Sequence, residues 1–364
     1  MQIPIYKPEL PPYEVVEPEI RAMYASGILY PGPFTDRLVA EVQEFCDVSY
    51  CLPVASCSLG LILMLSTLSR GSKVIMPAFT FNATLQALEW NGLVPVVVDV
   101  DENGQLSAAE VRACLDEHPH NVSAILGVHM WGNLLDTYEF DRIAAERGIP
   151  MFYDAAHALG SFDDEAVAPG SATCFSIAAT KPVSAGEGGL IVTNDGDMFN
   201  VLQDASSHGL YGSLDTKEKG INGKIQEFNS ILAYHAIQQF DKTKSRRREL
   251  MEYYRANLAD VPVRIWETRE GVDPSYKDCV LFTDSRDELD AFLQSKGVGT
   301  KRYFDPAIPD MGSFEGIVHS ADNGRKLAKT CLSLPLYPAL TNEEIEYIIN
   351  IVRSFFKGTN DTSV

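Results

Sequence analysis

Short apolar runs alternate with amphipathic segments over the first half of the chain. The apolar runs are rich in valine and isoleucine, which is typical of strands that are buried on both faces. The segments between them carry apolar residues three or four positions apart, which predicts helices. We expect strands within 51–56, 72–79, 94–100, 122–130, 149–156, 173–179 and 189–195, and helices within 36–48, 57–71, 82–92, 107–118 and 138–148.

This alternation predicts an α/β fold in which a mostly parallel, seven-stranded sheet is flanked by helices. In sheets of this kind, ligands bind outside the carboxyl ends of the strands. Candidate functional residues are therefore sought directly after each predicted strand. The residues at these positions include Ser56, Phe81, Trp131, Asp154 and Lys181.

The second part of the chain has a different pattern. One long amphipathic stretch at 225–260 leads into a segment with a predicted strand at 279–284 and helices at 285–297 and 342–356. We therefore expect a smaller α+β domain after the first one. The expected division is an N-terminal arm (1–12), a large domain (13–240), a small C-terminal domain (241–357) and a disordered tail (358–364).

Composition and charge narrow the choice of partners. The 364 residues are 45% hydrophobic, which is enough for two domains, and the formal net charge is −20. Nucleic acids and anionic membranes attract basic surfaces, so neither is expected as a partner. The basic run "SRRRELMEYY" is interpreted as a solvated face or a set of interface ion pairs.

The compartment is expected to be the cytoplasm. The N-terminus "MQIPIYKPELPPYE" lacks the apolar core of a signal peptide, and the longest apolar run, 59–65, is too short to span a bilayer. The seven cysteines contain no C-x-x-C pair, which favours reduced thiols over a disulfide framework or a zinc site.

Lys181 stands out because it lies in "FSIAATKPVSAGEGGLIVTND", between two apolar runs. Taken singly, the residues after the strands have ordinary explanations: lysine can extend to solvent, aspartate can cap a turn and serine can cap a helix. A histidine such as His157 can be hydrogen-bonded in the core. His129, His208 and His235 are scattered and indicate no metal site.

As a set, these residues match what pyridoxal 5'-phosphate requires of a protein. The aldehyde needs an amine to form a Schiff base, which Lys181 supplies. The pyridine nitrogen needs a carboxylate that keeps it protonated, and Asp154 lies at the end of the preceding strand. The phosphate needs N–H groups and hydroxyls at a helix N-terminus, which the turn at 55–61 and Ser176 offer. Phe81 can stack on the ring.

The chain resembles the fold-type I pyridoxal-phosphate enzymes, specifically the DegT/DnrJ/EryC1/StrS family of sugar aminotransferases, in a series of segments that follow the order found in that family. The matching segments are "PAFTFNATLQAL", "VPVVVDVD", "YDAAHALGS", "FSIAATKPVSAGEGGLIVTND", "SSHGLYG", "GINGKIQEFNSILA" and "CLSLPLYPALTNEEIEYI". The resemblance covers about residues 10 to 355. It implies a large domain of the fold-type I kind and a smaller C-terminal domain.

Carried onto this chain, the resemblance implies a role for each matching residue. Lys181 would hold the cofactor and act as general acid and base, Asp154 would pair with the pyridinium, and His157 would lie near the phenolic oxygen. The other cofactor-binding residues would be Phe81 on the ring, Ser56, Cys57 and Ser176 at the phosphate, and Asn222 from the neighbouring subunit. The enzyme would therefore be a homodimer with shared active sites.

The resemblance also implies a ping-pong transamination, with L-glutamate as donor and a keto sugar carried on a nucleotide as acceptor. The segment "GINGK" favours a 4-keto-6-deoxy sugar, and loops at 27–35 and 301–310 are expected to contact the nucleotide. Lys224 either binds the donor carboxylate or is a surface lysine near the interface.

Three alternatives stay open at this point. One is an aminotransferase that acts on a keto-cyclitol in aminoglycoside biosynthesis. Another is a pyridoxal-phosphate sugar dehydratase, whose family members carry histidine in place of the lysine, whereas Lys181 is present here. The third is a regulatory protein that keeps the cofactor fold, although Asp154 and Lys181 both remain.

Overall fold

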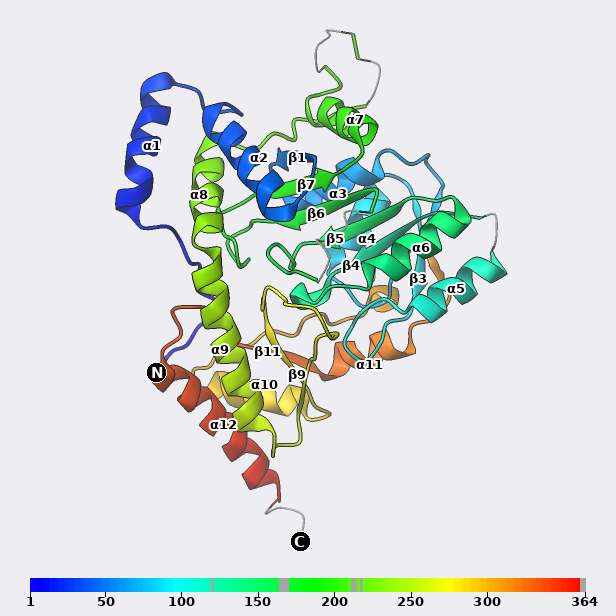
Figure 1. Cartoon of the computed structure of the whole chain (residues 1–364). Coiled ribbons are helices and arrows are strands. Elements are labelled where there is room, and N and C mark those ends of the chain that lie inside the picture. Colours follow the sequence, from blue (N-terminus) through cyan, green and yellow to red (C-terminus); the bar gives the residue numbers. More distant parts are fainter. Residues whose placement is uncertain (119–120, 164–169, 211–214, 217–218, 361–364) are drawn as a thin grey trace.

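The computed structural model describes residues 1–118, 121–163, 170–210, 215–216 and 219–360, which form two β-sheets (Figure 1). The larger sheet has the order β1-β7-β6-β5-β4-β2-β3-β10 and the smaller one β11-β9-β8. The strands are β1 (Tyr50–Val54), β2 (Lys73–Pro77), β3 (Val94–Val98), β4 (Val122–Val128), β5 (Met151–Ala155), β6 (Ala172–Ser176), β7 (Gly189–Thr193), β8 (Arg264–Ile265), β9 (Cys279–Phe282), β10 (Ile317–Val318) and β11 (Cys331–Leu334).

The large sheet confirms the predicted mostly parallel arrangement. Every pair from β6 to β10 is parallel, and β7 runs antiparallel to both of its neighbours. All seven predicted strands are present, but the sheet has an eighth strand, β10, which pairs with β3 through Val96 and Val97. Two residues are too few to show an alternating pattern, so β10 left no signal in the sequence.

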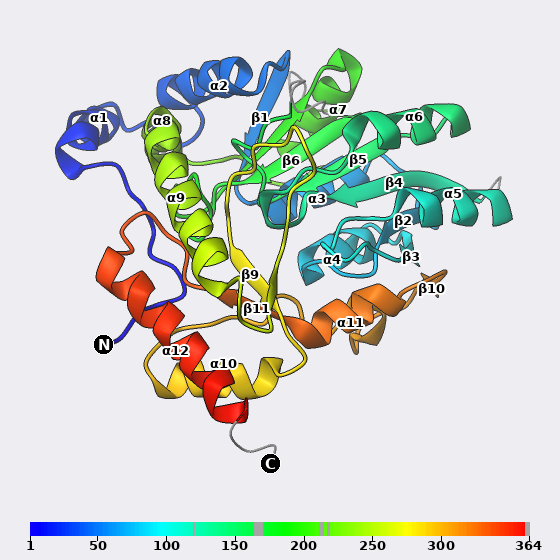
Figure 2. The same ribbon diagram turned by 60° about the horizontal axis from the view of Figure 1, so that its bottom comes forward.

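Helices cover both faces of the large sheet (Figures 1 and 2). The helices on one face are α3 (Cys57–Leu65), α4 (Asn82–Trp90) and α7 (Gly196–Ser206), and those on the other are α5 (Ala108–Glu117) and α6 (Thr137–Arg147). Strand β2 illustrates the two-sided burial, because Val74 and Met76 pack with α3 and α4 while Ile75 packs with α5 and α6. This explains why the strands are apolar at every position.

Four helices lie beside the β1 edge of the sheet or lead away from it. They are α1 (Tyr13–Ser26), α2 (Pro33–Cys46), α8 (Glu227–Gln238) and α9 (Phe240–Leu258). The predicted single stretch at 225–260 is thus two helices with a break at Gln239. The first turn of α8 is joined to that of α2 because the Glu227 carboxylate accepts hydrogen bonds from the N–H groups of Gly32, Phe34 and Thr35.

The small sheet packs with the C-terminal helices into a second core, in the lower part of Figure 2. These helices are α10 (Arg286–Ser295), α11 (Asp322–Thr330) and α12 (Asn342–Asn360), and 3-10 turns lie at Met130–Gly132 and Ile308–Asp310. The division into two domains at residue 240 stays a prediction. Helix α12 includes the first three residues of the predicted tail, so these are helical, and residues 361–364 lie outside the described residues.

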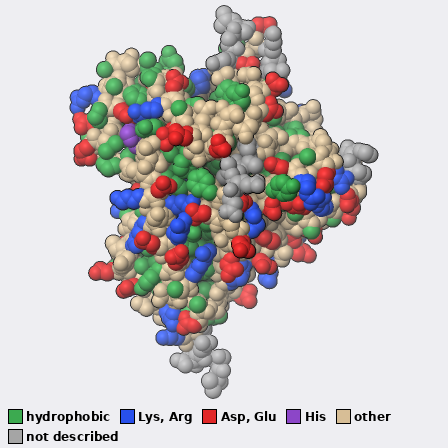
Figure 3. Space-filling model, in the orientation of Figure 1, with side chains coloured by type: hydrophobic (Ala, Val, Ile, Leu, Met, Phe, Trp, Pro, Cys, Tyr) green, Lys and Arg blue, Asp and Glu red, His purple; other side chains and the backbone are tan. Residues whose placement is uncertain are grey.

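The basic run at 246–248 is only partly a surface feature. Arg248 forms an ion pair with Asp273, but Arg247 is buried and its Nη1 donates to the Leu336 carbonyl over 2.8 Å. The interpretation as a solvated or interfacial face is therefore wrong for Arg247. Elsewhere on the visible face, acidic and basic side chains are interspersed (Figure 3). None of the described helices is long and apolar enough to cross a membrane.

Candidate active site

Lys181 lies in the connection between β6 and β7, which backbone hydrogen bonds fold into a compact loop. The N–H of Ala179 donates to Gly186 over 2.7 Å, and the N–H of Lys181 donates to Ala178 over 2.9 Å. Gly186 has φ of +85°, a conformation that favours glycine, which explains one glycine of the Gly-Glu-Gly-Gly segment. The loop thereby places the Lys181 side chain at the carboxyl end of the sheet.

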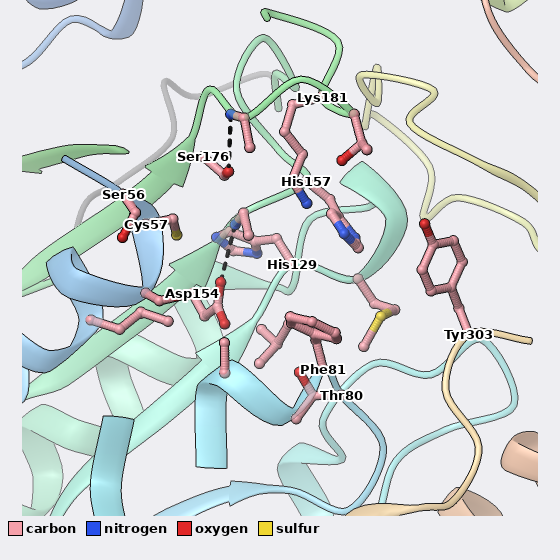
Figure 4. A pocket seen from close by; sticks show the side chains of 18 of the residues that line it. Ser56, Cys57, Thr80, Phe81, His129, Asp154, His157, Ser176, Lys181 and Tyr303 are labelled. Atoms are coloured by element: carbon pink, nitrogen blue, oxygen red, sulfur yellow. Dashed lines mark hydrogen bonds between the residues drawn. The ribbon is translucent and has the colours of Figure 1, made fainter. Parts of the chain in front are cut away.

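The predicted residues meet in one cavity of about 220 Å³ at this end of the sheet (Figure 4). The cavity is lined by Ser56, Cys57, Phe81, Asp154, His157, Ser176 and Lys181, among other residues. Asn222 does not line it; this residue is exposed, and a backbone bridge links it to Ser207. Its predicted role toward a neighbouring subunit stays a prediction.

Asp154 lies deep in the cavity and is 4% exposed. Its Oδ2 accepts a hydrogen bond from the Thr84 hydroxyl at 2.7 Å, and its Oδ1 accepts one from the N–H of Ala156 at 3.1 Å. Burial raises the pKa of this carboxyl, because these two neutral donors and the more distant Lys181 compensate only part of the lost hydration. A carboxylate in such a place favours a cation in the cavity, and a protonated ring nitrogen meets that requirement.

His157 presents a neutral imidazole to the same cavity. Its Nδ1 accepts a hydrogen bond from the backbone N–H of Trp131 at 3.2 Å, so the ring proton lies on Nε2. Burial lowers the pKa of His157 well below its usual value, and the positive charges of nearby lysines lower it further. The ring lies beside the Lys181 side chain in Figure 4 and is a hydrogen-bond donor at neutral pH.

The Lys181 amine is also shifted toward its neutral form. Burial lowers the pKa of Lys181 to about 8, and the ammonium group of Lys277 contributes in the same direction. An amine with this pKa loses its proton readily near neutral pH, which suits both a nucleophile and a general base.

The N-terminus of α3 supplies a place for an anion next to these groups. The Ser56 hydroxyl accepts a hydrogen bond from the N–H of Leu59, whereas the N–H groups of Cys57 and Ser58 have no acceptor within the helix. A Cβ atom on Gly189 would come within 2.7 Å of the Cys57 nitrogen, so glycine permits β7 to approach this turn. The helix N-terminus and its hydroxyls are suited to a phosphate.

Phe81 precedes α4 and is half-exposed, so one face of its ring is available to a ligand. Its centroid lies 5.5 Å from that of Phe304, which comes from the C-terminal half of the chain. The loop expected at 301–310 therefore reaches the cavity and contributes Lys301, Tyr303 and Phe304 to its wall. The loop expected at 27–35 contributes no lining residue to this cavity.

Sequence reasoning missed several contributors. Thr84, the partner of Asp154, lies one turn after Phe81 on a predicted helix, and its position within the "PAFTFNATLQAL" segment was the available signal. The Trp131 N–H, which donates to His157, could not be predicted, because a backbone group carries no residue-type signal. Trp131 has φ of +56°. Lys277 lies more than 90 residues downstream of Lys181, and nothing local marks it. Tyr303 belongs to the loop expected at 301–310, but the residue itself was not singled out.

The fold and this cavity define the class of protein: a transferase of the pyridoxal-phosphate-dependent α/β kind. The cofactor fits the residues present, since a buried carboxylate, an amine with a lowered pKa and a helix N-terminus line one cavity. The chain belongs to the DegT/DnrJ/EryC1/StrS aminotransferase family, whose model matches residues 14–353. It is therefore a sugar aminotransferase that uses pyridoxal phosphate.

Individual relatives are similar to this chain over nearly the full length of both sequences. The dTDP-4-amino-4,6-dideoxy-D-glucose transaminase of Shigella dysenteriae is 30% identical, over 97% of this chain and 99% of the relative. The GDP-perosamine synthase of Vibrio cholerae is 24% identical, over 97% and 99%. The crystal structure of DesI in the presence of its TDP-sugar product superimposes with a TM-score of 0.92 and 28% identity, covering 100% of this chain and 95% of DesI.

Proposed function

We propose that this enzyme transfers an amino group from L-glutamate to C4 of a 4-keto-6-deoxy sugar carried on a nucleotide. The observation that carries the proposal is that the Lys181 amine and the Asp154 carboxylate line one cavity at the carboxyl end of the sheet. The choice of acceptor is supported by the Shigella dysenteriae relative, whose name specifies a 4-amino-4,6-dideoxy sugar on dTDP. The cytoplasmic location stays a prediction.

Each residue has a distinct task in this proposal. Pyridoxal phosphate, when bound, supplies an aldehyde that reacts with amines and a cationic ring that withdraws electrons. Asp154 would keep the ring nitrogen protonated, and Thr84 holds that carboxylate in place. His157 would present its Nε2–H to the phenolic oxygen. Ser56, Cys57 and Ser176 would hold the phosphate, and Phe81 would lie against the ring.

Lys181 acts twice. It would hold the cofactor covalently in the resting enzyme. As a free amine, it would accept the proton from the α-carbon of the donor and give it up again in the same half-reaction. A pKa of about 8 lets Lys181 both take up and release this proton near neutral pH.

The same proposal includes a homodimer whose active sites are shared. Large apolar side chains are exposed on both sides of the α2–α8 junction, at Leu29, Tyr30, Ile221 and Phe228. Leu29 lies at this junction because its carbonyl accepts a hydrogen bond from the N–H of Glu227. A second copy that covered these side chains would bring Asn222 and Lys224, next to Ile221 in the sequence, toward the partner's cavity.

A panel of half-reactions tests the function. The enzyme is first converted with L-glutamate to its pyridoxamine-phosphate form, which is followed by its absorption spectrum. The expected result is that a nucleotide-linked 4-keto-6-deoxy sugar restores the aldehyde form. Restoration only by keto-cyclitols would favour the aminoglycoside alternative, and release of water from the sugar without amination would favour a dehydratase. A protein that binds cofactor but reacts with no donor would favour the regulatory alternative.

A further inference from the structure

A second, much smaller cavity of about 10 Å³ lies next to Lys181, on the side toward the C-terminal region. Several segments far apart in the sequence form its wall, including the N-terminal arm, α9 and the segment before β9. The charged residues of the wall are Lys7, Lys181, Arg247, Lys277 and Asp278. Four basic side chains therefore surround this space, with one carboxylate among them.

Within this group, Lys277 is buried, as Arg247 also is. It is 4% exposed, and its Nζ donates to Asp278 Oδ1 over 2.8 Å. Asp278 Oδ2 has no hydrogen-bond partner among the described residues, so the pair is fixed at one oxygen only. A buried ion pair contributes little net stability, since desolvation offsets its attraction. Stability alone gives no reason for an ammonium group at this position.

We propose that Lys277 is a positioning residue for transamination: its ammonium group, held by Asp278 on the wall of the cavity that it shares with Lys181, repels a proton on the Lys181 amine. The inference rests on the proposed role of Lys181 as general base. It differs from a purely structural ion pair because removal of the Lys277 charge changes the protonation of another residue.

The groups that face Lys181 from its surrounding elements have opposing effects on its proton. Asp154 in β5 and Asp278 before β9 favour the ammonium form, as would a thiolate at Cys57 on α3. Burial and the charge of Lys277 favour the neutral amine, and these two prevail because the pKa of Lys181 is lowered to about 8.

The remaining neighbours are cationic or neutral. The side chains of Tyr6, Lys7, Arg247 and Tyr303 line the small cavity with Lys181. His157 is neutral, as its lowered pKa requires. Burial lowers the pKa of Lys277, Asp278 raises it, and the charges of Arg247 and Lys301 lower it further. Burial also lowers the pKa of His157, and Lys301, which lines the larger cavity, adds to that effect.

Competitive acetylation of the cofactor-free full-length chain tests the proposal. Trace acetic anhydride reacts only with neutral amines, so the labelling of Lys181, quantified by mass spectrometry at each pH, reports its pKa. In the Lys277→Met variant we expect the Lys181 labelling curve to move upward by about one pH unit, which is roughly tenfold less labelling at pH 7. Lys277→Arg should leave the curve in place, because it keeps the charge.

Lys301→Met is the matched control, since it removes the same charge at the cavity mouth and should not move the Lys181 curve. If Lys277→Met does not fold, the Lys277→Met/Asp278→Asn double variant removes both charges and should move the curve upward by a smaller amount. A folded Lys277→Met or double variant that labels like the wild type overturns the proposal. The labelling curve does not depend on any substrate, so an inactive substrate panel would count against the proposed function without affecting this result.

Discussion

In the proposed function, the cofactor is attached covalently through the amine of Lys181. We expect Lys181→Ala to lose the yellow colour of the loaded enzyme and all turnover, while the fold is kept because the side chain belongs to a loop closed by backbone bonds. Absorption spectra, borohydride trapping and circular dichroism measure the three outcomes. Unaltered transamination by this variant would refute the assignment.

The role proposed for Asp154 is to keep the cofactor ring protonated, which affects the rate of turnover more than cofactor binding. Asp154→Asn keeps the size of the side chain but not the charge, so the ring nitrogen loses its support as an electron sink. We expect cofactor to be retained and kcat to fall by about two orders of magnitude or more. The control is Thr84→Val, which removes one hydrogen bond to the same carboxylate and should have a much smaller effect. Near-wild-type turnover of Asp154→Asn would remove this residue from its role.

At the level of single elements, Glu227 determines how α2 begins. Its carboxylate is fully buried and serves as the acceptor for three backbone N–H groups near the start of α2 and for the Thr35 hydroxyl. Glu227→Ala leaves these donors unpaired, and we expect the free energy of unfolding to fall by about 3 kcal/mol. Denaturant unfolding monitored by circular dichroism measures the change.

The matched control is Glu17→Ala, which removes an exposed partner of Arg21 on α1 and should cost less than about 0.5 kcal/mol. Equal losses in both variants would contradict the proposed link between α8 and α2. The comparison separates a buried carboxylate that caps a helix from an ordinary surface ion pair.

The residues at which helices begin and end were predicted less accurately than the positions of the helices. The helix expected at 57–71 ends at Leu65, because Ser66 and Thr67 bond back to carbonyls of the preceding turn. The helix expected at 36–48 starts earlier, at Pro33, since its first turn is capped by Glu227 from a distant segment. Local patterns indicated where these helices lie, whereas hydrogen bonds made on folding determined their limits.

For the assembly as a whole, Asn222 tests whether the active site is shared. We expect Asn222→Asp to weaken cofactor retention, because a carboxylate brought near the phosphate of the partner's cofactor repels it. Size-exclusion chromatography with light scattering and the absorbance of retained cofactor give the two readouts. The expected result is a dimer that loses cofactor on dilution, and a monomer with full activity would contradict the shared site.

The arrangement of strands and the main site residues could be predicted because each rests on a local pattern. Seven strands buried on both faces are recognisable from continuous apolar runs, and parallel pairing brings their carboxyl ends together. That geometry is sufficient to predict that Asp154 and Lys181 lie at the same edge of the sheet. The parts that were missed, such as β10 and the Trp131 N–H, are too short or act through the backbone.

The sequence alone was enough to predict an α/β enzyme with a lysine and an aspartate at the ends of neighbouring strands. This was possible because hydrophobic periodicity and residue type can be recognised within short segments. Folding in three dimensions settled which groups surround that lysine. The loop with Tyr303 and the Lys277–Asp278 pair reach it from more than 90 residues downstream. Burial and charge at a site depend on every segment packed against it, so the chemistry of Lys181 is a property of the assembled structure.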